Sequence, residues 1–341
     1  MKKNIFIENI NGNITSRPPV WFMRQAGRIL PSYLMLKQKY SFDEMMQNKE
    51  LAAKVTLLPL DNLRVDAAIL FSDILVIPKA LGLKLEFTAK GPKFLNALDE
   101  NINIENLKFN PQKLDYIYNN IREIKFQRPQ TPLIGFCGGP LTTFLFMFRR
   151  NELNKDFNHV IKLFYKERKK CIKIMEMITE ASIEYVNKQV ENGIDCFQLF
   201  ETYCGIIPEQ LYTESVLPYS RKILNAAMNK NCKTIFFPKN YNLGLKHLNK
   251  DTCDIVSVDW QIPIETARTL LNNDIGIQGN MDPRLFFSDK MKIEKYLMSL
   301  SNFGKKNTNW IFNLGHGFIP GIDVKNVNFV VEWVKNHNWN R

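Results

Sequence analysis

Two arginines stand four residues apart in the stretch VWFMRQAGRILPSY, residues 20–33. Arg24 and Arg28 follow four apolar residues and enclose Gly27. If the chain takes a helical turn here, the two guanidinium groups share a face, and such groups bind carboxylates and phosphates in bidentate fashion. Gly27 leaves room for a ligand or for strained backbone. The pattern therefore predicts an anion-binding site, with ion pairs to helix acids as the alternative.

A carboxylate and an imidazole also occupy unusual positions. Asp73 lies among apolar neighbours in FSDILVIP, where an unpaired charge is costly, so it needs a partner or a function. Capping of the next helix is the alternative. His316 lies in GHG, directly after an apolar run, which favours a functional role as much as a structural one. No His pair and no CxxC has the spacing of zinc ligands, so we expect no metal site.

Eight short apolar runs, separated by long helical stretches, are expected to position these residues. The runs are residues 20–23, 66–71, 132–138, 196–200, 234–238, 255–260, 275–280 and 310–315. Alternation of this kind predicts a (β/α)8 TIM barrel, with residues 1–341 forming a single domain. A doubly wound sheet is the competing fold, but the first run lacks a following G-x-G-x-x-G.

Two features of the barrel follow from the pattern. An insertion at about residues 79–127, between the second and third runs, contains LGLKLEFTAKGPKF, which suggests a small hairpin above the barrel mouth. The residues that follow the runs are expected to meet at that mouth, because active sites of barrels lie where strands end.

Composition limits the class of partner. The chain has 341 residues, 45% of them hydrophobic, and a net charge of +12. Nucleic acid, an anionic membrane surface or a polyanionic small molecule could explain the charge, and so could a lysine-rich surface without a partner. No apolar run is long enough to cross a membrane. The six cysteines form no CxxC, so we expect reduced thiols and a cytoplasmic protein.

With these motifs in view, the sequence resembles the uroporphyrinogen decarboxylase family. PPVWFMRQAGRILPSY resembles the N-terminal signature of that family, and the resemblance continues through AAILFSDILVIPKALGL, KGPKF, PLIGFCGGPLT, QLFETYCG, VDW, QGNMDP and FNLGHGFIPGID. It implies a (β/α)8 barrel that forms a homodimer. It also implies removal of carbon dioxide from the four acetate side chains of uroporphyrinogen III, giving coproporphyrinogen III on the heme pathway, without a metal or organic cofactor.

The resemblance also assigns roles to residues. Arg24 and Arg28 would bind substrate carboxylates. Asp73 would hydrogen-bond the pyrrole N–H groups and stabilise the ring after its protonation. The other residues expected to contact the substrate are Gln25, Ala26, Phe146, Thr202, Tyr203 and His316. The group that donates the proton is left open.

The chain departs from the family pattern at several positions. Phe146 stands where the family usually has a tyrosine, so a hydroxyl is absent, and Thr202 replaces a serine. Tyr203 stands where a histidine is frequent, and we hypothesise that it partly replaces the missing phenol. Ile29 and Lys37 stand in place of a tyrosine and an arginine. These departures concern the details of carboxylate binding.

Two other classes were weighed against this assignment. Methyltransferases of the wider superfamily often hold zinc through His and Cys at the barrel mouth, and the sequence offers no such set. A nucleic-acid-binding protein would need a basic patch with stacking aromatics or a docking helix, and no such module is recognised. We therefore expect a small-molecule substrate, with neither nucleic acid nor membrane as a partner.

Overall fold

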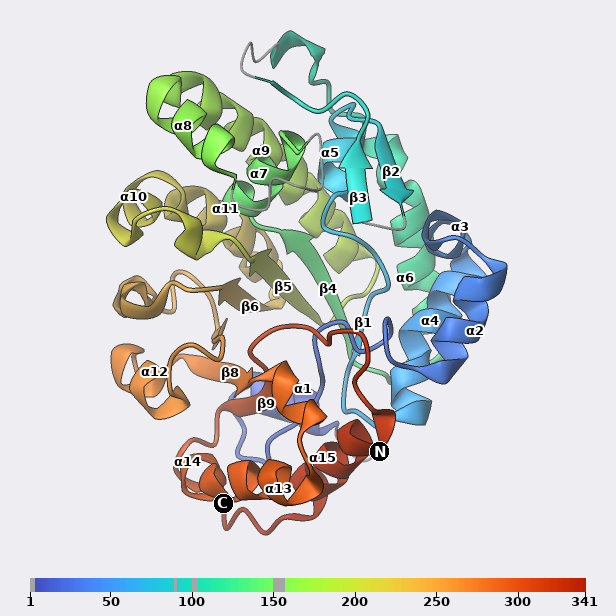
Figure 1. The fold of residues 1–341 in the computed structure, drawn as a ribbon, viewed down its shortest axis with the longest axis vertical. Helices are drawn as coiled ribbons and strands as arrows, with labels where there is room; N and C mark the ends of the chain where they lie inside the picture. The colour runs from blue at the N-terminus through green and yellow to red at the C-terminus, as the bar shows by residue number, and fades with distance from the viewer. Residues whose placement is uncertain (1–3, 89–90, 100–103, 150–156) are drawn as a thin grey trace.

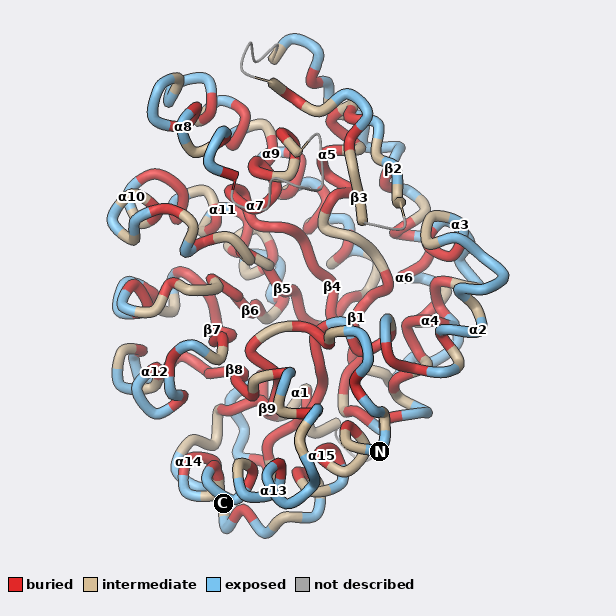
Figure 2. Tube along the Cα trace, viewed as in Figure 1, coloured by how far each residue is buried: buried red, intermediate tan, exposed pale blue. Residues whose placement is uncertain are grey.

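A curled parallel sheet forms the centre of the computed structural model, which describes residues 4–88, 91–99, 104–149 and 157–341 (Figure 1). Among these residues the sheet has seven strands in the order β1–β4–β5–β6–β7–β8–β9. Their bounds are β1 Ala68–Ile69, β4 Leu133–Gly138, β5 Cys196–Glu201, β6 Lys233–Pro238, β7 Ile255–Ser257, β8 Gly276–Met281 and β9 Trp310–Leu314. The strands are buried almost throughout, as expected for parallel strands between a core and a layer of helices (Figure 2).

Helices surround the sheet on its outer side (Figure 1). The longer ones are α4 Lys49–Asn62, α6 Asp115–Gln127, α9 Arg168–Glu191, α11 Leu217–Met228, α13 Lys290–Ser299 and α15 Val324–Asn336. The shorter ones are α1 Ile5–Ile10, α2 Pro31–Lys39, α3 Phe42–Gln47, α5 Val76–Ala80, α7 Pro140–Met147, α8 Asn158–Lys166, α10 Glu209–Ser215, α12 Ile264–Leu270 and α14 Ser301–Lys306. In α6, Ile117, Ile121 and Ile124 are buried at helical spacing and face the core.

The first predicted strand, residues 20–23, is reduced to a single parallel bridge between Val20 and Phe312. Beyond Val20, side chains replace the ladder: the Phe22 N–H donates to Gln25 Oε1 at 3.0 Å, and the Met23 N–H donates to Asn313 Oδ1 at 3.2 Å. The predicted eight-stranded barrel is therefore found only as a curled sheet of seven strands within the described residues.

Residues 19–20 nevertheless lie between the two ends of the sheet. The Phe312 N–H donates to the Pro19 carbonyl at 2.9 Å, and the Asp66 N–H donates to the Val20 carbonyl at 2.8 Å. On the same side, Asp66 accepts two hydrogen bonds from Arg17, at 2.7 and 2.8 Å. This segment therefore connects β9 to the chain that enters β1.

The hairpin expected in the insertion is confirmed. Strands β2 (Leu85–Thr88) and β3 (Gly91–Phe94) pair antiparallel, with Leu85 opposite Phe94. Phe87 on β2 contacts Phe42, with ring centroids 4.7 Å apart, and Phe42 contacts Phe71 at 5.0 Å. The hairpin is thereby joined by aromatic packing to the chain that follows β1.

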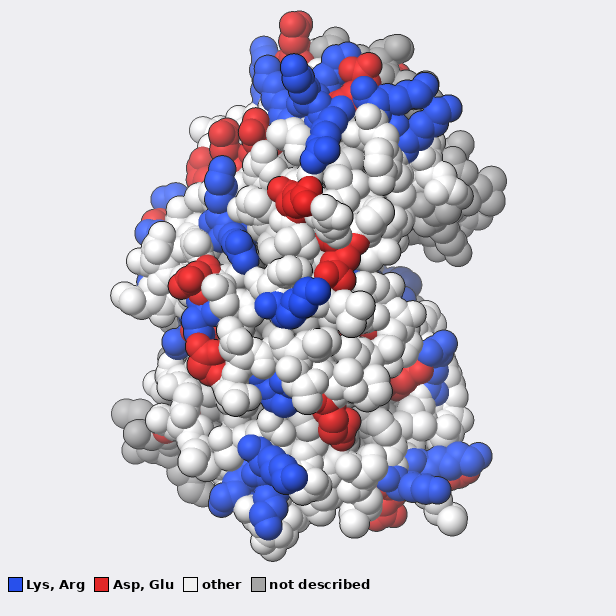
Figure 3. Space-filling model, turned by 90° about the vertical axis from the view of Figure 1, so that its left-hand side faces the viewer, with Lys and Arg blue, Asp and Glu red and all other residues white. Residues whose placement is uncertain are grey.

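Charged side chains do not form one continuous patch on the face shown in Figure 3, where groups of Lys and Arg alternate with Asp and Glu. In the part of the chain that the structure describes, no helix has both the length and the apolar character needed to cross a membrane.

Candidate active site

The carboxyl ends of the parallel strands bring polar residues to one end of the sheet, as the sequence predicts. Asp73 follows β1, Tyr203 follows β5, and His316 follows β9. Lys239 follows β6, and Trp260 lies shortly after β7. A buried strand precedes each of these positions by one to four residues, so the sheet determines where they lie.

Arg24 and Arg28 do not lie on a helical turn, and that prediction is wrong. Both residues adopt left-handed backbone conformations, with φ of 62° and 78°, in a loop that leads to α2. They are nevertheless close: burial lowers the pKa of Arg24 to about 10, and the charge of Arg28 adds to the effect. Although neighbouring atoms crowd it, Arg24 retains access to solvent. Its side chain lies across Gly317, where a Cβ would collide with it.

Asp73 is held beside Arg24 without forming an ion pair in the described residues. Its Oδ1 accepts a hydrogen bond from the Leu75 N–H at 2.8 Å, in the turn before α5 begins at Val76. No side chain caps α5, so the capping alternative is not found. Burial raises the pKa of the Asp73 carboxyl, while the Leu75 hydrogen bond and the charge of Arg24 oppose that rise. A carboxylate in this position is available to a cationic or N–H-bearing ligand.

Gln25 and Ala26, also expected to contact substrate, are both buried. The Gln25 side chain is fully enclosed: it accepts from the Phe22 N–H, and its Nε2 donates to the Ala67 carbonyl at 2.9 Å. The amide thus ties the arginine loop to the chain just before β1. Its contact with substrate stays a prediction.

His316 lies in an aromatic setting. Its ring centroid is 6.2 Å from that of Phe237 and 6.1 Å from that of Trp260. Burial lowers the pKa of this imidazole to about 3, and three cations add to the effect: Arg24, Lys239 and Arg28. His316 is therefore neutral at physiological pH. Its Nδ1 accepts from the Gly317 N–H at 2.7 Å, so the proton is on Nε2, where it can be donated to a carboxylate.

Phe146 lies on α7, the helix that follows β4, and Thr202 and Tyr203 directly follow β5. The rings of Phe146 and Tyr203 meet edge to face at 5.7 Å, and the Tyr203 N–H donates to Thr142 Oγ1 at 3.1 Å. Burial lowers the pKa of Arg24, and the nearby Tyr203 phenol opposes that change. Tyr203 is thus near Arg24, and Thr202 is half-buried. The hypothesis that Tyr203 replaces the missing phenol stays a prediction.

Sequence reasoning assigned no role to Glu201, the last residue of β5. Its carboxylate is fully buried and accepts from the Leu141 N–H at 3.2 Å, the Thr142 N–H at 2.7 Å and the Thr142 hydroxyl. Burial raises the pKa of Glu201 to about 7, although these hydrogen bonds lower it. The position directly after LF in QLFETYCG was the available signal. Glu201 fixes the start of α7, the helix that carries Phe146.

Lys239 and Trp260 were also overlooked. Lys239 Nζ lies over the Trp260 ring, 5.5 Å from its centroid. Lys239 directly follows the apolar run TIFFP and Trp260 ends the run IVSVDW, a position that was a partial signal only.

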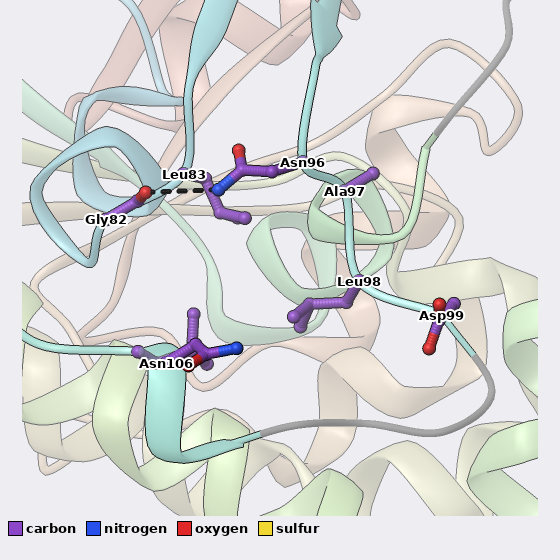
Figure 4. A pocket seen from close by; sticks show the side chains of 8 residues that line it. Gly82, Leu83, Asn96, Ala97, Leu98, Asp99 and Asn106 are labelled. Carbon is purple, nitrogen blue, oxygen red and sulfur yellow. Dashed lines mark hydrogen bonds between the residues drawn. The ribbon is translucent and has the colours of Figure 1, made fainter.

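The pocket described next does not include the side chains named above. A pocket of about 180 Å³ lies in the insertion, lined in part by Leu83, Asn96 and Leu98 (Figure 4). It belongs to the segment around the hairpin, away from the ends of the central strands. No group of three His, Cys, Asp or Glu side chains suited to a metal ion is found in the described ranges.

Comparisons with known proteins agree with the motifs. A family model described as Uroporphyrinogen decarboxylase (URO-D) matches residues 1–337. The uroporphyrinogen decarboxylase of Trichlorobacter lovleyi is 35% identical over 334 residues, covering 97% of this chain and 98% of the relative. That of Chlorobium phaeobacteroides is 35% identical over 345 residues, covering 98% of each. A methyltransferase from Methanosarcina mazei has a TM-score of 0.79 at 18% identity over 98% of both chains, which indicates a shared fold alone.

Proposed function

Because the chain belongs to the uroporphyrinogen decarboxylase family, we propose that it removes carbon dioxide from the four acetate side chains of uroporphyrinogen III to give coproporphyrinogen III. The substrate carries eight carboxylates on a flexible ring of four pyrroles. An enzyme that acts on it must hold several carboxylates and also stabilise positive charge on a pyrrole. These two demands need cations and an acid in one site.

The arrangement at the strand ends supports that chemistry. Protonation of a pyrrole ring creates an electron sink that accepts the electrons of the breaking carbon–carbon bond. Asp73, next to Arg24 but not neutralised by an ion pair in the described residues, can accept hydrogen bonds from pyrrole N–H groups and stabilise the cation. Arg24 and Arg28 bind carboxylates in this proposal, and neutral His316 donates a hydrogen bond to another.

The single observation that carries the proposal is the proximity of Asp73 to Arg24, which itself lies near Arg28, with no ion pair among these three residues in the described part of the chain. The test is anaerobic incubation with uroporphyrinogen III, followed by oxidation and separation of the porphyrins by their number of carboxyl groups. Products with seven, six, five and four carboxyl groups are expected. Unchanged octacarboxylate would contradict the proposal.

Three further parts of the proposal concern the whole chain. Residues 20–23 would act as an eighth, irregular strand that closes a (β/α)8 barrel of one domain, supported by the hydrogen bonds of Pro19 and Val20 to both ends of the sheet. The protein would act as a homodimer without a cofactor. The cytoplasm is its proposed location, supported by six buried cysteines that remain unpaired.

A further inference from the structure

We infer that Lys239 is a third carboxylate-binding cation of the active site, acting together with Arg24 and Arg28. The inference rests on the proposed function for the identity of the substrate, but its geometry is independent of it. Lys239 and His316 contact the same indole: the lysine Nζ lies 5.5 Å from the Trp260 ring centroid, and the imidazole centroid lies 6.1 Å from it.

The backbone of Lys239 is fixed on both sides. Its N–H donates to the Glu201 carbonyl at 3.1 Å, and its carbonyl accepts from the Gly205 N–H at 3.1 Å. The next N–H, that of Asn240, donates to the buried carboxylate of Asp259 at 2.5 Å. The backbone on both sides of Lys239 is therefore held by Glu201, Gly205 and Asp259, which fixes the point from which its side chain extends.

Among the described residues, no carboxylate compensates the charge of Lys239. Two cations lie against Trp260, namely Lys239 and Arg284, whose guanidinium carbon is 5.3 Å from the ring centroid. Arg284 is paired with Asp282, which accepts from its Nε at 2.9 and 3.0 Å and from its Nη2 at 2.6 Å. Lys239 forms no ion pair with a carboxylate in the described residues. Lys239 is a half-buried cation near His316, on which the charges of Arg24 and Arg28 also act, and such a group of cations suits a ligand with several carboxylates.

The test compares Lys239→Met, which keeps the length of the side chain without the charge, with Lys239→Arg and with Arg284→Gln. One readout is the Kd of uroporphyrin, the oxidised octacarboxylate, which does not depend on turnover. The other is the KM and kcat for uroporphyrinogen. Lys239→Met is expected to raise Kd and KM about tenfold with kcat changed less than about threefold. Lys239→Arg is expected to restore most of the affinity, and Arg284→Gln to leave it within about twofold.

The outcomes separate the two proposals. Unchanged Kd and KM in Lys239→Met would overturn the inference while wild-type turnover still supports the proposed function. A wild-type protein without turnover would overturn the proposed function, whereas a tenfold loss of uroporphyrin binding in Lys239→Met would still support the inference. If Arg284→Gln weakened binding as much as Lys239→Met, the effect would arise from packing on Trp260, and the inference would fail.

Discussion

At the scale of single residues, Asp73 combines two tasks. One carboxylate oxygen accepts from the Leu75 N–H in the turn before α5, and the described residues supply no ion pair for the charge. In Asp73→Asn the amide oxygen can still accept this hydrogen bond. We therefore expect an unchanged melting temperature and a kcat at least about a hundredfold lower, because the negative charge that stabilises the ring cation is gone.

The pH profile provides a second measurement on the same variant. Because burial raises the pKa of Asp73, wild-type kcat is expected to fall as the pH is lowered through that raised pKa, where the carboxylate takes up a proton. The Asp73→Asn variant has no such group, so its residual kcat is expected to stay constant over the pH range in which the wild-type kcat falls. An equally steep limb in the variant would assign the titration to another residue.

Tyr203 is expected to supply the phenol that position 146 lacks. The two rings are in contact, and Tyr203 is the one electrostatically coupled to Arg24. Phe146→Tyr is therefore expected to change kcat/KM less than about threefold, and Tyr203→Phe to lower it about tenfold. The double variant serves as the control, since a new hydroxyl at 146 that can substitute for the old one would rescue the rate. A large gain in Phe146→Tyr alone would show that Tyr203 does not fill this role.

At the scale of elements, a buried glutamine joins the arginine loop to the sheet. Gln25→Ala leaves the Phe22 N–H and the Ala67 carbonyl without partners. Orphaned buried groups cost about 1–3 kcal/mol each, so we expect a loss of about 2–4 kcal/mol in the free energy of unfolding. The substrate KM is expected to rise as well, because a displaced loop carries Arg24 away from its position.

Gln189 offers a matched control on the other side of the sheet. It is equally buried, and its amide forms the same pair of hydrogen bonds with one backbone residue, accepting from the Phe136 N–H and donating to the Phe136 carbonyl, both at 3.1 Å. Gln189→Ala is expected to cost a similar free energy of unfolding with KM unchanged. Equal effects of the two variants on KM would mean that the Gln25 bridge has no particular role in placing the arginines.

The carboxylate of Glu201 makes the attachment of α7 to β5 dependent on pH. Burial raises its pKa from 4.5 to about 7, so the folded protein keeps a proton that the unfolded chain releases. This contribution to stability is full below pH 4.5 and is lost as the pH rises towards 7. Thermal unfolding of wild type and Glu201→Gln should therefore show a difference in melting temperature that changes between these pH values. A constant difference would contradict the assignment.

The extent to which the sequence predicts the fold depends on which groups form the backbone hydrogen bonds. Apolar runs bounded by turn residues predicted the positions of β4, β5, β6 and β9 to within one residue at each end. The run at 20–23 is just as apolar, but the side chains of Gln25 and Asn313 accept hydrogen bonds from the Phe22 and Met23 N–H groups. The spacing of apolar residues does not reveal these side-chain bonds. No sequence pattern indicates the left-handed φ of Arg24 and Arg28, because arginine has no preference for that conformation.

At the scale of the whole molecule, the site is a product of strand order more than of local sequence. Asp73 and His316 are 243 positions apart in the numbering, yet parallel strands bring the residues that follow them to the same end of the sheet. Strand-end position alone was sufficient to find both. Strand-end position was not sufficient for Lys239. In the sequence, a lysine after a proline resembles a surface residue, and only the structure shows its contact with Trp260, which follows the neighbouring strand.

The net charge of +12 raises the question of whether the whole surface or only the site attracts the polyanionic substrate. Electrostatic interactions in water are screened over about 8 Å at physiological ionic strength, so remote lysines should contribute little. We expect kcat/KM to fall as salt is added, with kcat nearly constant, and the slope to be reduced in Arg28→Gln. Lys222→Gln removes the same charge from an exposed position on α11 and should leave the slope unchanged. Equal slopes for the two variants would instead mean that the charge of the molecule as a whole guides the substrate.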